Sequence, residues 1–407
     1  LPPGGQAALT VYVTVAPEQD GARTTGVDLR RRGWEALLAE TLNWLRARRT
    51  HLDDPELAWR VDRNRFFTHF FSSGRTLDTE EWVAVTSRSP RYYVSGAYWA
   101  RDSLLWSLPG LLTVESATAR EVLRFAFRSG WRHPGMHAQY VNGAVLYPGF
   151  ELDELAAYPV ALGRYLDATQ DETLLHEPEV RRALAEFPDV LHQLGGPGPL
   201  YRTFLDPSDD PPPHPFLTYD NALLWRALVE LRRIGRRVSL GRLADWAERT
   251  ARQLRQAILG TCVVEGPFGP MFAWAVDGQG HFTRYDDPPG SLQLLGVLGL
   301  CDPRHPALVN TIRWVHSPHN PHWYAGDFAE AGCAHSPHPW PMAAANTLLA
   351  LAAMGWPSRQ PAFPTAEARS AGAPEAPHVP DVEAPLAELW HQALKLLKHA
   401  PMDGGLV

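Results

Sequence analysis

The spacing of apolar residues predicts a chain built mainly from helices. From residue 51 onward, apolar positions recur every three or four residues in successive segments, the period of an amphipathic helix. The predicted helices lie at about 55–72, 98–113, 117–130, 151–169, 176–193, 218–235, 240–259, 290–300, 304–316, 340–355 and 384–399. Several starts carry a capping side chain before a proline: Asp54-Pro55, Glu177-Pro178 and Asp302-Pro303.

The first 50 residues follow a different pattern. Residues 8–16 alternate β-branched and aromatic residues with others up to Pro17, which predicts a strand that needs partners outside this sequence. Residues 27–49 predict a helix with one apolar stripe, formed by Trp34, Leu37, Leu38, Leu42, Trp44 and Leu45. We therefore expect residues 1–26 to end a β-domain or lead into the next one, 27–50 to form a linker helix, and 51–407 to form a catalytic domain.

The succession of helices predicts a helical toroid. Eleven helices follow one another without the rhythm of a parallel sheet, and an (α/α)6 barrel needs twelve. The chain ends where another helix is expected, so we expect a truncated C-terminus. An α-solenoid is the alternative, but the sequence has no repeat of 34 or 40 residues. Short β-like pieces occur at 91–95 and 272–276, and the Ala/Pro/Glu-rich segment 357–385 predicts a surface loop.

Composition excludes several classes of partner. The net charge of −7 indicates neither a nucleic-acid binder nor a polyacid binder, and Lys395 and Lys398 are the only lysines. No apolar run reaches the ~20 residues of a membrane span, and the longest, 292–300 and 343–354, predict buried helices. The sequence makes no prediction of oligomeric state.

Three widely spaced cysteines bear on the compartment. Cys262, Cys301 and Cys333 form neither a C-x-x-C pair nor a disulfide framework, which favours a reducing compartment such as the cytoplasm. No signal peptide is evident, but the chain begins with Leu1, so we expect the natural N-terminus to lie elsewhere.

Aromatic residues are abundant, with 15 Trp, 12 Tyr and 15 Phe. Large packed cores explain this content as well as a carbohydrate cleft does, in which sugar C–H faces stack on indole rings.

Two predicted helix starts combine charged residues. Arg101 and Asp102 follow several aromatic residues, and such a pair can either clamp vicinal sugar hydroxyls or form a structural ion pair. Glu151, Asp153 and Glu154 open another helix, where carboxylates are usually solvated residues favoured by the helix dipole. Glu151 and Asp153 could nevertheless both face one cleft.

Two further segments resemble these starts. Asp220 and Asn221 begin a helix after Tyr219. The stretch 316–340 holds Asp327, Glu330 and several aromatic residues together with five histidines: His316, His319, His322, His335 and His338. Their spacing fits no H-E-x-x-H pattern, so sugar-contacting or structural histidines are favoured over a metal site.

Taken in order, these motifs resemble the metal-independent α-mannosidases of glycoside hydrolase family 125 and, more loosely, other (α/α)6 glycosidases. They extend over residues 92–341. The matching residues are Trp99, Arg101, Asp102, Glu151, Asp153, Tyr158, Pro159, the stretches 286–292, 317–322 and 326–330, then Ser336-Pro337-His338 and Trp340-Pro341.

The resemblance implies exo-acting, inverting hydrolysis of α-1,6-linked mannosides without a metal or cofactor. Asp153 would be the general acid and Glu330 the base that activates water. Tyr147, Phe150 and Tyr158 give Asp153 an aromatic surrounding that helps to keep an acid protonated. The candidates for substrate contact are Trp99, Arg101, Asp102, Glu151, Asp220, Asn221, Trp323, His335, His338 and Trp340.

The motif stretch also departs from the family. The interval from Glu330 to Ser336 is longer than the family's, that from His338 to Trp340 is shorter, and a later His-Glu-Ser-Phe stretch is absent. Two alternatives therefore stay open: a hydrolase of α-glucosides or glycosyl-glycerate on the same barrel, and a carbohydrate-binding relative without catalysis.

Overall fold

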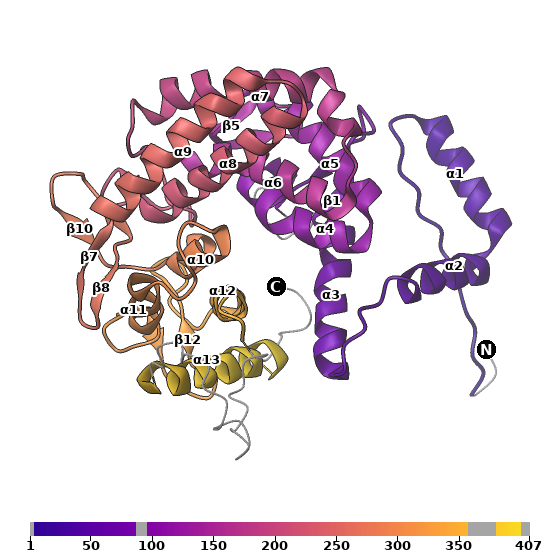
Figure 1. The fold of residues 1–407 in the computed structure, drawn as a ribbon. Coiled ribbons are helices and arrows are strands. Elements are labelled where there is room, and N and C mark those ends of the chain that lie inside the picture. Colours follow the sequence, from indigo (N-terminus) through magenta and orange to yellow (C-terminus); the bar gives the residue numbers. More distant parts are fainter. Residues whose placement is uncertain (1–3, 87–95, 357–379, 400–407) are drawn as a thin grey trace, which may run out of the picture.

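The computed structural model describes residues 4–86, 96–356 and 380–399, and these are mainly helical (Figure 1). The inner layer consists of segments that contact one another in order: η1 Arg101–Ser107 continuing as α4 Leu108–Val114, α6 Leu152–Thr169, α8 Thr218–Arg237, η6 Leu292–Leu294 continuing as α10 Leu295–Leu298, and α12 Pro341–Ala353. The outer layer consists of α3 Pro55–Phe71, α5 Ser116–Arg128, α7 Pro178–Val190, α9 Gly241–Thr261, α11 Pro306–Val315 and α13 Pro380–His399.

The helices return to their starting point. Contacts lead from α4 through α6, α8, α10, α12 and α13 to α3, which packs on α4. This circuit confirms the predicted toroid of paired helices and excludes an extended solenoid. Helix α6 is apolar on nearly every side and almost wholly buried, whereas α9 buries a single stripe.

Short antiparallel strands lead into the inner helices. β3 Ala97–Tyr98 precedes η1, β5 Val145–Phe150 precedes α6, β6 Phe216–Leu217 precedes α8, and β12 Glu330–Ala331 precedes α12. Their partners are β4 Met136–Tyr140, β9 Ala275–Val276 and β11 Trp323–Tyr324. The other strands are β1 Ser73–Arg75, β2 Trp82–Ala84, β7 Val263–Gly266, β8 Gly269–Phe272 and β10 Phe282–Thr283. Four segments of the inner layer, η1, α6, α8 and α12, therefore each follow one of these strands.

The N-terminal region differs from the prediction. Residues 4–18 form no strand, since no segment in the described part of the chain pairs with them, and Leu9, Val11, Val13 and Val15 are exposed. The predicted single helix is two helices, α1 Gln19–Arg32 and α2 Trp34–Arg46, because Gly33 adopts a φ of 79°. Both lie outside the ring in Figure 1. The predicted stripe is largely exposed, although Trp44 packs on α3.

The predicted caps have mixed outcomes. Asp54 caps α3 through bonds from two backbone N–H groups. Glu177 precedes Pro178 but pairs with arginines of α5 instead of capping α7. Asp302 accepts a hydrogen bond from the Arg304 N–H in the turn before α11, and the His305 side chain accepts the hydrogen bond at the start of α11 itself.

Two predicted inner helices are irregular. The segment predicted at 98–113 begins as the π-helix η1, and the one at 290–300 consists of 3-10 turns and the short helix α10, which ends at the left-handed Gly299. The β-like piece at 272–276 matches the end of β8 and β9, whereas 91–95 and most of 357–385 lie outside the described residues.

Two further observations complete the fold. No helix in the described part of the chain has both the length and the apolar character needed to cross a membrane. Cys262, Cys301 and Cys333 are unpaired and buried.

Candidate active site

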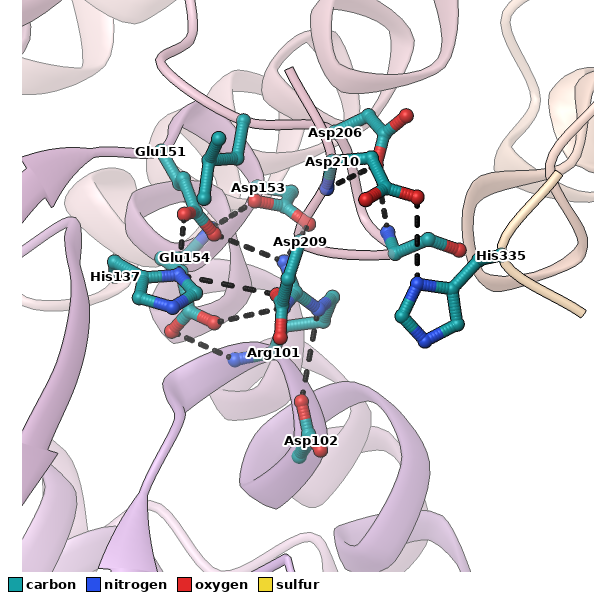
Figure 2. Close-up of polar contacts among 12 residues, drawn as sticks. Arg101, Asp102, His137, Glu151, Asp153, Glu154, Asp206, Asp209, Asp210 and His335 are labelled. Carbon is teal, nitrogen blue, oxygen red and sulfur yellow. Dashed lines mark hydrogen bonds and ion pairs between the residues drawn. The ribbon is translucent and has the colours of Figure 1, made fainter. Parts of the chain in front are cut away.

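The predicted polar residues gather where the inner helices begin. Arg101 starts η1, Asp153 lies in the first turn of α6, Asp220 in the first turn of α8, and Glu330 on the strand before α12. All four are buried. Figure 2 shows the part of this site around Arg101. Partial positive charge at helix N-termini favours carboxylates there, so the geometry suits an acidic site.

The Arg101 guanidinium is the centre of the cluster. Its Nη1 donates to Glu151 and to Asp153, each at 3.0 Å, and its Nη2 donates to Asp209 at 2.6 Å (Figure 2). Glu154 lies 3.7 Å from Nη2 and also accepts from the Arg101 backbone N–H. Asp102 lies 3.6 Å from Nε. One guanidinium therefore faces five carboxyl groups.

Burial, together with the excess of acids, keeps protons on the carboxyl groups of this site. Burial raises the pKa of Asp102 to about 6, and burial raises the pKa of Glu154 and Asp220 well above the ordinary carboxyl value. Burial also raises the pKa of Glu151. A site that holds several protons near neutral pH is suited to general acid catalysis.

His137, which the sequence did not single out, completes the cluster. Its Nδ1 lies 2.5 Å from Glu151 Oε1 and 3.8 Å from Asp209. Burial lowers the pKa of His137, but the Glu151 hydrogen bond and neighbouring charge outweigh burial and raise the pKa overall. His137, Glu151 and Asp209 have the spacing of metal ligands. Arg101 already donates to both carboxylates, so a guanidinium charge stands where a cation would be held.

The loop 206–210 supplies residues that the sequence analysis missed. Asp206 accepts hydrogen bonds from the backbone N–H groups of Ser208 and Asp210, each at 3.0 Å. This tight turn places Asp209 at a left-handed φ of 66° and aims it at Arg101. Ser208 Oγ donates to the buried Asp287 at 2.6 Å. The sequence Asp-Pro-Ser-Asp-Asp-Pro does predict a turn here. It does not show that the turn contacts Arg101.

Glu330 lies in a separate part of the site. Its Oε1 accepts from the backbone N–H of Ala331 at 2.8 Å and lies 3.4 Å from Nδ1 of the buried His316. Burial raises the pKa of Glu330 to about 8, and the charge of Asp286 acts in the same direction. Asp286 itself accepts from Ser291 Oγ and the Leu292 N–H, and burial raises its pKa to about 6.

The three tryptophans predicted to stack on sugar rings are more buried than residues of an open stacking surface would be. Trp99 is 3% exposed and packs edge-on against His137. Trp323 and Trp340 are half-buried against a small cluster that includes Met271.

The remaining predicted contacts divide into two groups. The Asp220 carboxylate has no hydrogen-bond partner among the described residues, whereas the Asn221 amide bonds to the Tyr201 N–H and C=O and to the Leu217 C=O. His335 is exposed and lies 3.3 Å from Asp210, and His338 bonds to Ser336.

The five histidines of 316–338 do not converge on a common point. His319 packs against Phe268 and His322 against Tyr285, while His316 faces Glu330. None of them occurs in the group of described residues with metal-ligand spacing.

A toroid of paired helices with buried carboxyl groups at the inner helix starts is the arrangement expected of a glycosidase of the (α/α) barrel class. Within that class, residues 194–353 match the family model described as metal-independent alpha-mannosidase (GH125), which supports the resemblance found in the sequence. The match contains Glu330, Asp220 and Asp286, and it begins after Arg101 and Asp153. Among curated proteins, none matches this chain.

Solved structures extend the likeness of fold over most of the chain. A metal-independent α-mannosidase from Streptococcus pneumoniae, in a non-productive complex with alpha-1,6-mannobiose, is 19% identical with a TM-score of 0.65, covering 78% of this chain and 85% of that one. A structure described as a wild-type glycosidase is 16% identical with a TM-score of 0.56, covering 86% and 98%. A glycosidase variant in complex with glucose is 15% identical, with a TM-score of 0.54 and the same coverage.

Proposed function

We propose that this glycosidase is an exo-acting α-mannosidase that cleaves α-1,6-linked mannosides with inversion, using Asp153 as general acid and Glu330 as base. The observation that carries the proposal is the placement of two buried carboxyl groups at the entrances of two inner helices, α6 and α12, of a barrel whose residues 194–353 match α-mannosidases. The α-1,6 linkage follows the mannobiose bound to the pneumococcal relative.

The surroundings of each residue support its role. Asp153 shares Arg101 with Glu151 and Asp209, so a sugar that displaces one carboxylate also changes the charge around Asp153. Glu330 uses Oε1 for its protein contacts, which leaves Oε2 for a water molecule.

The sugar contacts that we propose are Trp99, Arg101, Asp102, Glu151, Asp220, Trp323, His335, His338 and Trp340. Asp220 is the strongest of these, because a buried carboxyl without a protein partner gains most from a sugar hydroxyl. For Asn221 we propose a structural role, since its amide holds the Tyr201 backbone against α8.

One observation favours the reverse assignment of acid and base. With its pKa raised to about 8, Glu330 is protonated at neutral pH in the free protein, whereas Asp153 accepts a hydrogen bond from a guanidinium. In this second candidate, Glu330 protonates the leaving oxygen and Asp153 activates the water.

Leaving-group dependence tests both assignments. Asp153→Asn should lower kcat/KM by about 10²–10⁴-fold on α-1,6-mannobiose but far less on an activated aryl α-mannoside, because a good leaving group needs no proton. Glu330→Gln should lower the rate on both substrates. The opposite pattern selects the reverse assignment, and wild-type rates in both variants would reject this pair of residues.

The glucose complex of a similarly folded glycosidase favours a second function, hydrolysis of an α-glucoside or glucosyl-glycerate. A panel of aryl α-mannosides, aryl α-glucosides and the corresponding disaccharides separates the two by kcat/KM. Binding without turnover of any of them would indicate a non-catalytic relative.

We also propose that catalysis needs no metal. Rates should survive exhaustive dialysis against EDTA, because Arg101 takes the place of a cation between Glu151 and Asp209. Loss of activity that zinc or calcium restores would contradict this proposal.

Finally, we propose that residues 51–407 form the catalytic unit, with 1–26 as a lead-in and 27–50 as a linker. Three unpaired cysteines support a reducing compartment such as the cytoplasm.

A further inference from the structure

A buried histidine faces the carboxyl group of Glu330. His316 follows α11, and both its side chain and that of Glu330 are 2% exposed. Its Nδ1 lies 3.4 Å from Glu330 Oε1, an ion-pair distance, and has no hydrogen-bond partner among the described residues. An isolated buried N–H or lone pair is costly, so this contact has a physical consequence for both groups.

The far side of the ring is held in place by two residues from other elements. His316 Nε2 lies 3.1 Å from Gln293 Oε1 on η6 and 3.1 Å from Thr347 Oγ1 on α12. The ring also packs edge-on against Trp323 on β11, at 5.3 Å between centroids. The position of Nδ1 is therefore fixed by three elements, as a residue that orients another must be.

The hydrogen-bonding groups around the neutral His316 ring indicate that its proton lies on Nδ1. Thr347 Oγ1 lies 3.0 Å from the Ala343 carbonyl, where a helical threonine commonly donates. The Gln293 NH₂ group is buried without an acceptor among the described residues. When the Gln293 side-chain amide is turned by about 180°, its NH₂ group donates to His316 Nε2 and Thr347 Oγ1. Only the Gln293 amide oxygen is then left without a partner. Nε2 is then an acceptor, and Nδ1 carries the proton toward Glu330.

We propose that His316 is a positioning residue that donates its Nδ1–H to Glu330 and so favours the ionised carboxylate that the base needs. The inference rests on the proposed role of Glu330. Burial lowers the pKa of His316 to about 3, so the ring acts as a neutral donor and does not itself change charge in the working range.

Other groups near Glu330 act differently from His316. Asp286 raises the pKa of Glu330 through its charge, and Tyr324 is the cross-strand neighbour of Glu330 on β11. Within the described residues, His316 is thus the side-chain donor that can offset burial.

Two substitutions of similar size distinguish the contact made by Nδ1 of His316 from the contacts made by Nε2. Asn places its amide near the position of Nδ1, whereas Gln reaches the position of Nε2. His316→Gln should therefore lose the contact with Glu330, and His316→Asn should keep a donor there. On any substrate that the wild-type protein hydrolyses, we expect the acid limb of the kcat/KM profile to move up by about one pH unit in His316→Gln and by less than half of that in His316→Asn.

A stability measurement tests the contact without relying on activity. Urea unfolding of the wild type, His316→Gln, Glu330→Gln and the double variant is compared at pH 5.5 and pH 9. Because the pKa of Glu330 is about 8, the carboxyl is protonated at the lower pH and ionised at the higher one. The destabilisation caused by His316→Gln should be larger at pH 9, and this pH dependence should vanish in the Glu330→Gln background.

The outcomes are distinguishable from failure of the proposed function. One outcome is a coupling between His316 and Glu330 that depends on pH while the alkaline limb of the kcat/KM profile moves instead of the acid limb. That result supports the contact but makes Glu330 the general acid. Equal destabilisation at both pH values, or a coupling larger at pH 5.5, overturns the inference whatever the substrate. If the His316 variants do not fold, Thr347→Val loosens the ring without touching Glu330, and its coupling to Glu330→Gln should show the same sign.

Discussion

At the scale of single residues, Arg101 has the most concentrated set of contacts in the described structure. It is 2% exposed and lies within 4 Å of five carboxyl groups. Removing one partner of a buried ionic cluster leaves charges without compensation, which is more damaging than losing a surface pair. The cluster is therefore expected to hold the starts of η1 and α6 and the loop 206–210 together.

Arg101→Met should lower the free energy of unfolding by about 3–5 kcal/mol at pH 7.5. The loss should be smaller at pH 5, since more of the carboxyl groups are then protonated and need no cation. Urea denaturation at both pH values measures this. Arg124→Met is the control, because Arg124 pairs with Glu121 and Glu177 at the surface and its loss should cost at most about 1 kcal/mol. A loss at Arg101 no larger than at Arg124 would contradict the prediction.

A buried carboxyl near Glu330 predicts a pH dependence of stability. Burial raises the pKa of Asp286 to about 6 in the folded state, from about 3.9 when unfolded. The folded state thus binds more protons between pH 4 and 6, so the contribution of Asp286 to stability is present at low pH and lost as pH rises. Relative to Asp286→Asn, the wild type should lose about 2 kcal/mol of unfolding free energy between pH 4 and 7.

Asp277 provides a control of opposite sign. A hydrogen bond from the Gln279 backbone, followed by one from His281, lowers the pKa of Asp277 to about 2. Its stabilisation is lost only below pH 4, so Asp277→Asn should leave the slope between pH 4 and 7 unchanged. If Asp286→Asn also left the slope unchanged, Asp286 would have an ordinary pKa in the folded protein.

At the scale of elements, the π-helix η1 has an identifiable cause. Pro109 lies just after it and cannot donate to the carbonyl of Leu105, four residues earlier. Arg164 of α6 donates to that carbonyl instead, at 3.2 Å. The Leu108 N–H bonds to Ser103, a five-residue spacing typical of a π-helix. The entrance of the first inner helix is thus tied to α6, which carries Asp153.

A double-mutant cycle can detect this compensation. Arg164→Met should cost about 1–3 kcal/mol in the wild-type background, because it leaves the Leu105 carbonyl without a partner. In a Pro109→Ala background the restored N–H can bond to Leu105, so the same substitution should cost less. Thermal and urea unfolding of the four proteins measure the difference. Equal costs in both backgrounds would show that Arg164 does not substitute for the missing N–H.

The elements also show what sequence patterns can predict. Helices α3, α6, α8 and α9 are predicted to within a few residues. The helical period is readable in α9, which buries a single stripe, whereas α6 is buried on nearly every side and its start is marked by its charged residues. Gly33 was a local signal for the break between α1 and α2 that the apolar stripe concealed. The short turns that replace a helix at 288–298 were not predictable, since their register depends on the contacts of Asp286 and Ser291.

At the scale of the whole molecule, the site combines parts that are far apart in the chain. Arg101 and Asp209 are 108 residues apart, and no local pattern links them. Residues at helix starts, such as Asp153 and Asp220, could be predicted because each motif marks its own helix. His137, Asp209 and His316 could not, since their roles arise only when the ring brings separate helix entrances together.

The ring also places the two proposed catalytic carboxyls on different sectors, and this predicts the stereochemistry. Asp153 enters from α6, and Glu330 enters from the strand before α12, with α8 and α10 between these helices in the inner layer. Carboxyls that enter from separate sectors of the ring suit the separation of roughly 6.5–9.5 Å that leaves room for a water molecule and gives inversion, whereas about 5 Å gives retention.

Hydrolysis of an α-mannoside should therefore release β-mannose first. Proton NMR of the anomeric signals in the first minutes of a reaction measures this, with α-mannose appearing later at the rate of mutarotation. Mannose alone in the same buffer gives the mutarotation rate as the control. If α-mannose appears first, the carboxyls act as nucleophile and acid/base in a retaining mechanism, and Glu330 would then attack the sugar carbon instead of activating water.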